Sequence, residues 1–132
     1  MTQPVVHFEI IGTDPAKLRS FYGELFGWEF QMGDATTDTV SRPGEYGFVN
    51  ASDAGVNGGV GGGPGYERRV LFYVGVPDVE AALRKAESLG GMRRMGPEPE
   101  AATAADLVVG HFADPEGNLV GVAGPVRSEG GR

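Results

Sequence analysis

The sequence contains no cysteine, no apolar run long enough to cross a membrane, and few clustered basic residues. Without cysteine there is no disulfide, thiolate zinc site or cysteine nucleophile, which fits a reducing compartment and predicts a cytoplasmic protein. No segment approaches ~18 apolar residues, and the first residues lack the pattern of a signal peptide, so we expect neither a membrane span nor secretion. The net charge is −7 and the basic clusters are the pairs Arg68–Arg69 and Arg93–Arg94, so we expect no nucleic-acid partner.

The composition that remains is typical of one globular domain. The chain has 132 residues, of which 40% are hydrophobic and 22% charged. A chain of this length buries roughly two-thirds of its unfolded surface around one core. Glycine is abundant, at 23 residues, and is densest over residues 55–66. That stretch lacks the Gly-Lys-Ser/Thr ending of a phosphate-binding loop and leads into a strand, so we interpret it as a glycine-rich strand followed by a linker.

The chain is predicted to contain the same unit twice. A strand over residues 5–11 leads to the helix N-cap Asp14 and to a helix over about 15–26. Later, a strand over 69–76 leads to a second N-cap, Asp78, and a second helical pattern. The two N-caps are 64 residues apart, and a constant offset of 64 pairs similar residues along most of the chain.

Three shorter apolar segments follow each predicted helix, so each unit is βαβββ. We predict an α+β fold in which two βαβββ modules form a cupped mixed sheet, with helices outside and a cavity inside. A Pro/Ala-rich segment over 96–105 is predicted as a loop that covers the cavity. The predicted strands are 28–32, 45–50 and 55–61 in the first module, and 92–96, 106–113 and 118–123 in the second. The predicted boundaries are a single domain 1–125, modules 4–62 and 69–125, a linker 63–68 and a disordered tail 126–132.

Two segments, HFEIIGTDPAKLRSFYGELFGW and FADPEGNLVGV, resemble the vicinal oxygen chelate superfamily, also called the glyoxalase, bleomycin resistance and dioxygenase group. The resemblance covers about residues 5–125. Its most specific parts are the pair Phe21–Tyr22 before Leu-Phe-Gly and the turn Asp114–Asn118. The LFGW ending is similar to a small bacterial subgroup related to lactoylglutathione lyase. The resemblance implies a cavity between paired modules, where the superfamily's enzymes hold a divalent metal through His, Gln or Glu on the first and last strand of each module.

The metal-ligand positions that the resemblance implies fall on His7, Leu71, Asn57 and Gly121. His7 lies seven residues before the first N-cap, and Gly121 lies three residues after Asn118; the other two positions follow from the offset of 64. Leucine and glycine side chains offer no donor, and asparagine offers only a neutral carbonyl oxygen. A catalytic divalent site needs about three nitrogen or anionic oxygen donors. We therefore expect no cofactor, with a nonstandard divalent metal site as the alternative.

Strand alternation predicts which side chains face the cavity. If His7 faces it, then Glu9 does too, while Phe8 packs under the helix. The repeat turns Tyr73 inward in the same way, and placing Phe48 and Phe112 on the helix side turns His111 inward. Trp28 is either a residue of a half-buried strand or an aromatic wall of the ligand site. The candidate ligand-binding residues are His7, Glu9, Trp28, Asn57, Tyr73 and His111.

Three functions are compatible with this reading, and the sequence leaves open whether the protein is an enzyme. The first is a protein that binds a small organic molecule in the cavity, for sequestration, resistance or metabolite binding. The alternative is a glyoxalase-like lyase or isomerase, or a dioxygenase, with a nonstandard metal site at His7, Glu9 and His111. A third variant is a metal-free isomerase with Glu9 or His7 as the general base. Because superfamily members often pair modules between chains, a homodimer is also considered.

Overall fold

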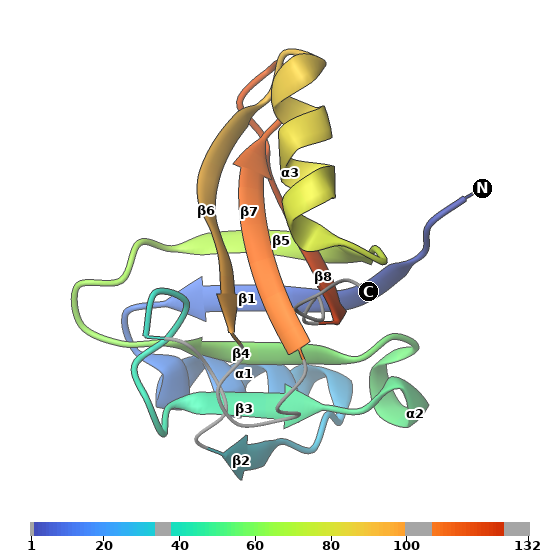
Figure 1. Cartoon of the computed structure of the whole chain (residues 1–132). Helices are drawn as coiled ribbons and strands as arrows, with labels where there is room; N and C mark the ends of the chain where they lie inside the picture. Colours follow the sequence, from blue (N-terminus) through green and yellow to red (C-terminus); the bar gives the residue numbers. More distant parts are fainter. Residues whose placement is uncertain (1, 34–37, 100–106, 126–132) are drawn as a thin grey trace.

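The computed structural model describes residues 2–33, 38–99 and 107–125. In these residues one eight-stranded sheet has the strand order β2-β3-β4-β1-β5-β8-β7-β6. Figure 1 shows β6 and β7 turned across the strands of the first module, so the sheet is strongly curled. The predicted α+β fold is confirmed. The elements are β1 (Val5–Gly12), α1 (Pro15–Phe26), β2 (Gln31–Gly33), β3 (Tyr46–Val49), α2 (Ala51–Ala54), β4 (Gly58–Gly62), β5 (Arg69–Gly75), α3 (Val79–Ser88), β6 (Met92–Pro99), β7 (Leu107–Ala113) and β8 (Leu119–Pro125).

The two modules join through the antiparallel pairing of β1 with β5. Phe8 pairs with Phe72, the residue 64 positions later in the sequence. A residue that pairs with its own repeat equivalent lies on the local twofold axis, so this axis passes through the Phe8–Phe72 pair. Outside it, β1 pairs with β4 and β5 pairs with β8, both in parallel. The repeat seen in the sequence is therefore also a repeat in space.

The offset between equivalent residues decreases towards the end of each module. Glu9 pairs with Gly59, and the equivalent Tyr73 pairs with Gly121. The last strands are thus related by an offset of 62, and the equivalent of Gly121 is Gly59. The predicted equivalence of Gly121 with Asn57 is wrong, because Tyr73 and Gly121 are two residues closer in the sequence than Glu9 and Gly59 are.

The same drift changes the third strand of each module. Gly59 pairs with Phe48 in β3, whereas Gly121 pairs with His111 in β7. Phe48 is therefore the equivalent of His111, at an offset of 63. The predicted equivalence of Phe48 with Phe112 is wrong by one residue. A one-residue change of register moves a side chain to the opposite face of the sheet.

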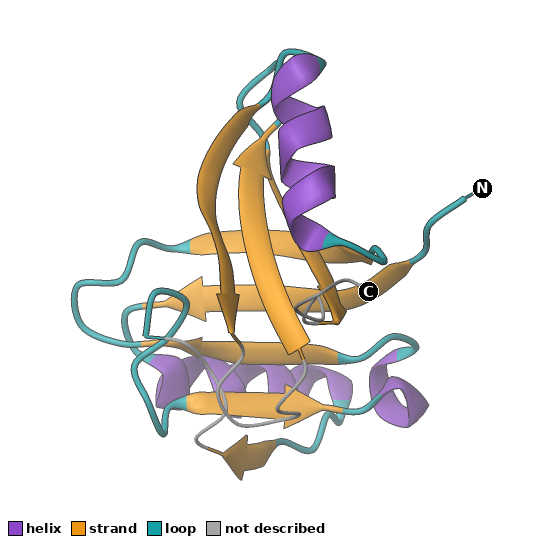
Figure 2. Cartoon of the chain, in the orientation of Figure 1, coloured by secondary structure: helices purple, strands orange, loops and turns teal. Residues whose placement is uncertain are grey.

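Two helices cover the outer face of the sheet, as Figure 2 shows. Helix α1 spans the predicted residues, and the Asp14 side chain caps it by accepting a hydrogen bond from the Lys17 N–H at 3.2 Å. Helix α1 ends where Gly27 adopts a positive φ of 75°, which glycine tolerates. The Asp78 side chain caps α3 in the same way. In the described residues, no helix has the length and apolar character that a bilayer span requires.

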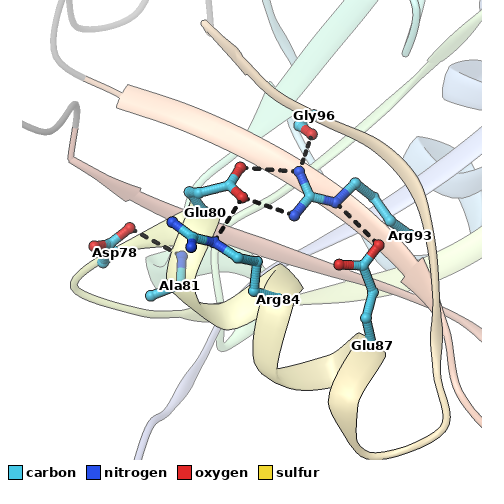
Figure 3. A network of polar contacts seen from close by, with 7 residues as sticks. All are labelled: Asp78, Glu80, Ala81, Arg84, Glu87, Arg93 and Gly96. Carbon is cyan, nitrogen blue, oxygen red and sulfur yellow. Dashed lines mark hydrogen bonds and ion pairs between the residues drawn. The ribbon is translucent and has the colours of Figure 1, made fainter.

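An ion-pair network fastens α3 to β6 (Figure 3). Arg93 donates hydrogen bonds to both carboxylate oxygens of Glu80, each at 2.9 Å, and another to the Gly96 carbonyl oxygen. Its Nε also pairs with Glu87 at 3.5 Å, and Arg84 shares Glu80 at 3.1 Å. The hydrogen bonds from Arg93 lower the pKa of Glu80, so this carboxylate stays ionised. Helix α3 and the edge strand β6 are therefore tied together by charge.

Two local predictions need correction. The strand predicted over 28–32 is observed only as β2, so residues 28–30 belong to the connection from α1. The loop predicted over 96–105 is wrong for residues 96–99, which continue β6, and the rest of that segment lies outside the described residues. The tail 126–132 also lies outside them. The short helix α2 was not predicted at all.

Candidate functional site

The concave face of the sheet carries a cavity of about 520 Å³, which we call the cup. Its lining comes from both modules, because β1 and β5 form its floor. A cavity of this size accommodates a small organic molecule. The polar residues that line it are His7, Glu9, Gln31, Asn50, Asn57 and Tyr73, and its apolar walls include Met32, Val40, Phe48, Val49, Leu107 and Val109.

Five side chains at the cup form one continuous set of hydrogen bonds, which we call the polar network. Glu9 is its centre. Tyr46 donates its hydroxyl proton to Oε1 of Glu9 at 2.9 Å, and Tyr73 donates to Oε2, also at 2.9 Å. On the far side, the Tyr46 oxygen lies 2.8 Å from Nε2 of His7, and the Tyr73 oxygen lies 2.7 Å from Nε2 of His111. The network thus runs from one module into the other.

The protonation of Glu9 sets the direction of these hydrogen bonds. A phenol has one hydrogen, so when both tyrosines donate to the carboxylate, each tyrosine oxygen accepts from the Nε2–H of its histidine. The Nδ1 atom of His7 then carries a lone pair. When Glu9 is protonated, its O–H can donate to Tyr46, whose own hydrogen then points to Nε2, and the His7 proton resides on Nδ1. One proton on Glu9 therefore switches the tautomer of His7.

Burial controls the pKa values in the network. Burial raises the pKa of Glu9 to about 7, against the opposing hydrogen bonds of the two tyrosines and the positive charge of Arg69. Burial lowers the pKa of His7 to about 4. It also lowers the pKa of His111 to about 4, with a further lowering by Arg69 and an opposing effect of Glu98. Near neutral pH both histidines are uncharged, and Glu9 is the group that titrates.

Two glycines make room for the two tyrosine rings. A Cβ atom added to Gly59 would overlap the ring of Tyr46, and one added to Gly121 would overlap the ring of Tyr73. These glycines occupy equivalent places in β4 and β8. Each ring therefore lies directly on the neighbouring strand, where any other residue would displace it.

Comparison with known proteins agrees with this architecture. A family model described as a glyoxalase-like domain matches residues 7–123, which is most of the chain. The chain belongs to the glyoxalase-like domain family. No curated protein matches the sequence.

Solved structures with the same fold include three that cover almost the whole glyoxalase-like domain. A hypothetical protein from Bacillus halodurans C-125 has a TM-score of 0.68 at 14% identity and covers 98% of this chain and 99% of its own. A glyoxalase/bleomycin resistance protein/dioxygenase superfamily member from Vibrio splendidus 12B01 has a TM-score of 0.57 at 20% identity, and the match covers 93% of this chain and 99% of that one. Streptomyces coelicolor methylmalonyl-CoA epimerase, in complex with 2-nitronate-propionyl-CoA, has a TM-score of 0.65 at 15% identity, and the match covers 95% of this chain and 99% of that one. At these identities the likeness shows the fold, and function has to be argued from the site.

The side chains of this glyoxalase-like domain do not fit the divalent metal that the resemblance implies. In the part of the chain that the structure describes, no three His, Asp or Glu side chains gather as donors to one ion. The hypothetical set of His7, Glu9 and His111 is not a three-donor group, because Tyr46 and Tyr73 separate each histidine from the carboxylate. The last-strand position at Gly121 has no donor, and the ring of Tyr73 fills the space beside it.

The structure brings together most of the predicted site residues of this domain. His7, Glu9, Asn57 and Tyr73 line the cup, and His111 is buried at the far end of the polar network. The side-chain oxygen of Asn57 accepts a hydrogen bond from the Ala51 N–H at 2.8 Å, so part of this side chain holds the start of α2 in place.

Trp28 is not part of the cup. It packs on the outer face, with ring centroids 5.2 Å from Phe8 and 5.1 Å from Phe26 of α1. The alternation of residues 28–32 suggested a strand that faces the ligand, but Trp28 precedes that strand and closes the gap between α1 and β1. Trp28 is not among the residues that line the cup, and its role as a ligand-binding residue stays an untested prediction.

Tyr46 is the site residue that sequence analysis missed. A constant repeat offset placed Phe48 on the helix side, and with it every second residue of that strand. The observed register turns Phe48 into the cup and Tyr46 onto the same face, where Tyr46 is 1% exposed. The one signal in the sequence was the glycine-rich strand β4, whose missing side chains indicate that a large neighbour lies against it.

Proposed function

We propose that this glyoxalase-like domain binds a small organic molecule in the cup between its two modules. The supporting observation is a concave cavity of about 520 Å³ in which polar side chains converge among apolar walls. This combination is typical of small-molecule sites, in which apolar walls supply affinity and a few polar groups fix orientation. His7 and Asn57 are the residues we expect to orient the ligand, while the buried hydroxyl of Tyr73 is bonded to Glu9 and His111.

The charges around the cup favour a neutral ligand. Among the described residues that line it, none is lysine or arginine, and the carboxyl group is that of Glu9. An anionic ligand would lack a cation to pair with and would face a partly ionised carboxylate. We therefore expect a neutral molecule with hydrogen-bonding groups, held for sequestration or as a metabolite.

Two hollows on the outer face are weaker candidates. One of about 610 Å³ lies beside α3, and one of about 880 Å³ lies beside α1. Neither includes a member of the polar network. Their linings belong to the helices and the backs of the strands, where the sheet is only partly covered.

The test of binding is a screen of neutral fragments by amide-resolved NMR, followed by calorimetry. Compounds that bind are expected to perturb the amides of β1, β5 and β8 on the concave face. Ala123→Leu narrows the cup and should weaken binding at least tenfold, because its added atoms take ligand volume. Ala81→Leu, the same substitution on the exposed surface of α3, should leave the affinity unchanged. Equal affinity in both variants, or perturbations confined to the outer face, would contradict the proposal.

A further inference from the structure

His7 is the member of the polar network that a ligand in the cup can touch. Both carboxylate oxygens of Glu9 are occupied by tyrosine hydroxyls, and Glu9 is only 3% exposed. His7 is partly exposed and uses Nε2 for its hydrogen bond to Tyr46. Among the described residues, the fully buried polar side-chain atom that lacks a hydrogen-bond partner is Nε of Arg69. Nδ1 of His7 is therefore not fully buried and keeps some exposure, and the cup is the cavity that His7 lines.

An imidazole that accepts a proton on Nδ1 can release another from Nε2. With Glu9 ionised, Nε2–H donates to the Tyr46 oxygen, and the Tyr46 hydroxyl donates to Glu9. A proton taken up at Nδ1 therefore allows the Nε2 proton to move to Tyr46 and the Tyr46 proton to move to Glu9. Both hydrogen bonds, at 2.8 and 2.9 Å, have ordinary lengths. His7 and Tyr46 end uncharged, and the net change is one proton on Glu9.

We infer that the cup carries out metal-free proton transfer on a neutral carbon acid, with His7 as the contacting acid–base group and Glu9 as the proton store behind Tyr46. In the step, a substrate C–H bond breaks, its proton goes to Nδ1 of His7, and its electron pair stays on the substrate as an enolate or its equivalent. Return of a proton from Nδ1 to another substrate atom completes an isomerisation. Nothing is oxidised or reduced, and no co-reactant is needed. The inference rests on the proposed function, since the substrate has to bind in the cup.

The surroundings of Glu9 support this role. The titratable and charged groups that face it are Tyr46 from β3, and Tyr73 and Arg69 from β5. His7 and His111 follow behind the two tyrosines, with Glu98 of β6 near His111. Burial raises the pKa of Glu9 to about 7, whereas it lowers that of His7 to about 4. The hydrogen bond through Tyr46 thus gives a weakly basic imidazole access to a base matched to neutral pH.

A chromogenic carbon acid tests the inference without knowledge of the natural substrate. In 5-nitrobenzisoxazole, a base removes the ring C–H proton, the N–O bond breaks, and a coloured phenolate is released. With excess EDTA present, the wild-type protein should convert this probe saturably, at a rate that rises with pH through about 7. This midpoint follows from the inferred role of Glu9 as the final proton acceptor.

The decisive variants differ from the wild type by one hydroxyl group. Tyr46→Phe cuts the connection between His7 and Glu9, so the rate should fall by about 10²-fold and the midpoint near pH 7 should disappear. Glu9→Gln in the Tyr46→Phe background should cause no further loss, because both changes cut the same path. Tyr73→Phe keeps the connection from His7 to Glu9 but removes a hydrogen bond to the charged form of Glu9, so the midpoint of its pH profile should move to higher pH. Urea unfolding checks that each variant is folded.

Each other outcome overturns the inference in a distinguishable way. A Tyr46→Phe variant with the wild-type rate and pH profile would show that no proton passes through Tyr46. Calorimetry with 5-nitroindazole, an isostere that lacks the N–O bond, separates binding from chemistry. If the isostere binds but 5-nitrobenzisoxazole is not converted, the proton transfer is excluded and the proposed binding function stands. If neither the isostere nor any neutral fragment binds in the cup, the proposed function fails and the inference fails with it.

Discussion

Glu9 is held between two opposing effects. Removal from water favours the neutral acid, while the hydroxyl groups of Tyr46 and Tyr73 favour the carboxylate. Burial is the larger effect, so the pKa of Glu9 lies near 7 rather than at its ordinary value of 4.5. His7 and His111 shift in the other direction because a cation is also penalised by burial. These shifts make the stability of the fold depend on pH.

We predict that Glu9→Gln changes the pH dependence of folding. The unfolded chain loses the Glu9 proton near pH 4.5 and the folded protein near pH 7, so in between the folded state binds more protons. The contribution of Glu9 to stability is therefore fully present below pH 4.5 and lost as the pH rises through 7. The pKa rise corresponds to about 3 kcal/mol. Urea titrations should show that the unfolding free energy of Glu9→Gln, relative to that of the wild type, rises by about this amount between pH 4.5 and pH 8.

The histidines do not disturb this comparison. Their lowered pKa values make both proteins less stable as the pH falls below 6.5, and this effect cancels in the difference. The control is Glu24→Gln, the same substitution on the exposed surface of α1, measured over the same pH range. A difference between Glu9→Gln and wild type that does not change with pH would contradict the raised pKa of Glu9 in the folded protein.

Tyrosine rings packed on glycine strands are the contacts between elements that shape the site. The ring of Tyr46 in β3 lies against Gly59 in β4, and the ring of Tyr73 in β5 lies against Gly121 in β8. Glycine lowers the intrinsic strand preference of both positions. Here the absence of a side chain leaves room for a tyrosine ring whose hydroxyl reaches Glu9. The glycines in β4 and β8 are therefore needed for the polar network to form.

We predict that Gly59→Ala destabilises the protein by about 1–3 kcal/mol, although alanine suits a strand better than glycine. The added methyl group overlaps the ring of Tyr46 and forces it to move. Urea unfolding of the single and double variants forms the test. In a Tyr46→Leu background the smaller side chain should relieve the clash, so Gly59→Ala should cost clearly less there. The same cost in both backgrounds would contradict the packing described.

The whole molecule is a pair of modules that share one site. The twofold axis lies at the Phe8–Phe72 pair, and the polar network crosses from the first module to the second beside it. On the outer face of the same strands, Val70 is 72% exposed and Phe72 is 43% exposed. The homodimer considered from the sequence stays a prediction, which sedimentation velocity measures.

We predict that divalent metals are not required for the fold. The positions at which the resemblance places metal ligands carry too few donor atoms among the described residues, and the ring of Tyr73 fills the space beside Gly121. Dialysis against EDTA, or addition of Zn²⁺, Ni²⁺ or Mn²⁺, should therefore change the melting temperature by less than about 1 °C. A saturable rise with one metal, abolished by His7→Phe, would show that a site exists.

The sequence by itself determined the local elements and the repeat. Helix starts at Asp14 and Asp78, the βαβββ order and the inward side of β1 all follow from short-range rules of capping and alternation. On that basis His7, Glu9 and Tyr73 were placed at the cup correctly. These features need only neighbours within one strand or one helical turn.

The tertiary structure alone decided the rest. Strand pairing joins residues far apart in the sequence, and the drift of the repeat offset from 64 to 62 is set by the connections between strands. That drift turns Tyr46 and Phe48 into the cup, while the late start of β2 leaves Trp28 outside it. Because one residue of register reverses the face of a side chain, no local pattern could place Tyr46 against Glu9. The shifted pKa of Glu9 depends on the burial that this register creates.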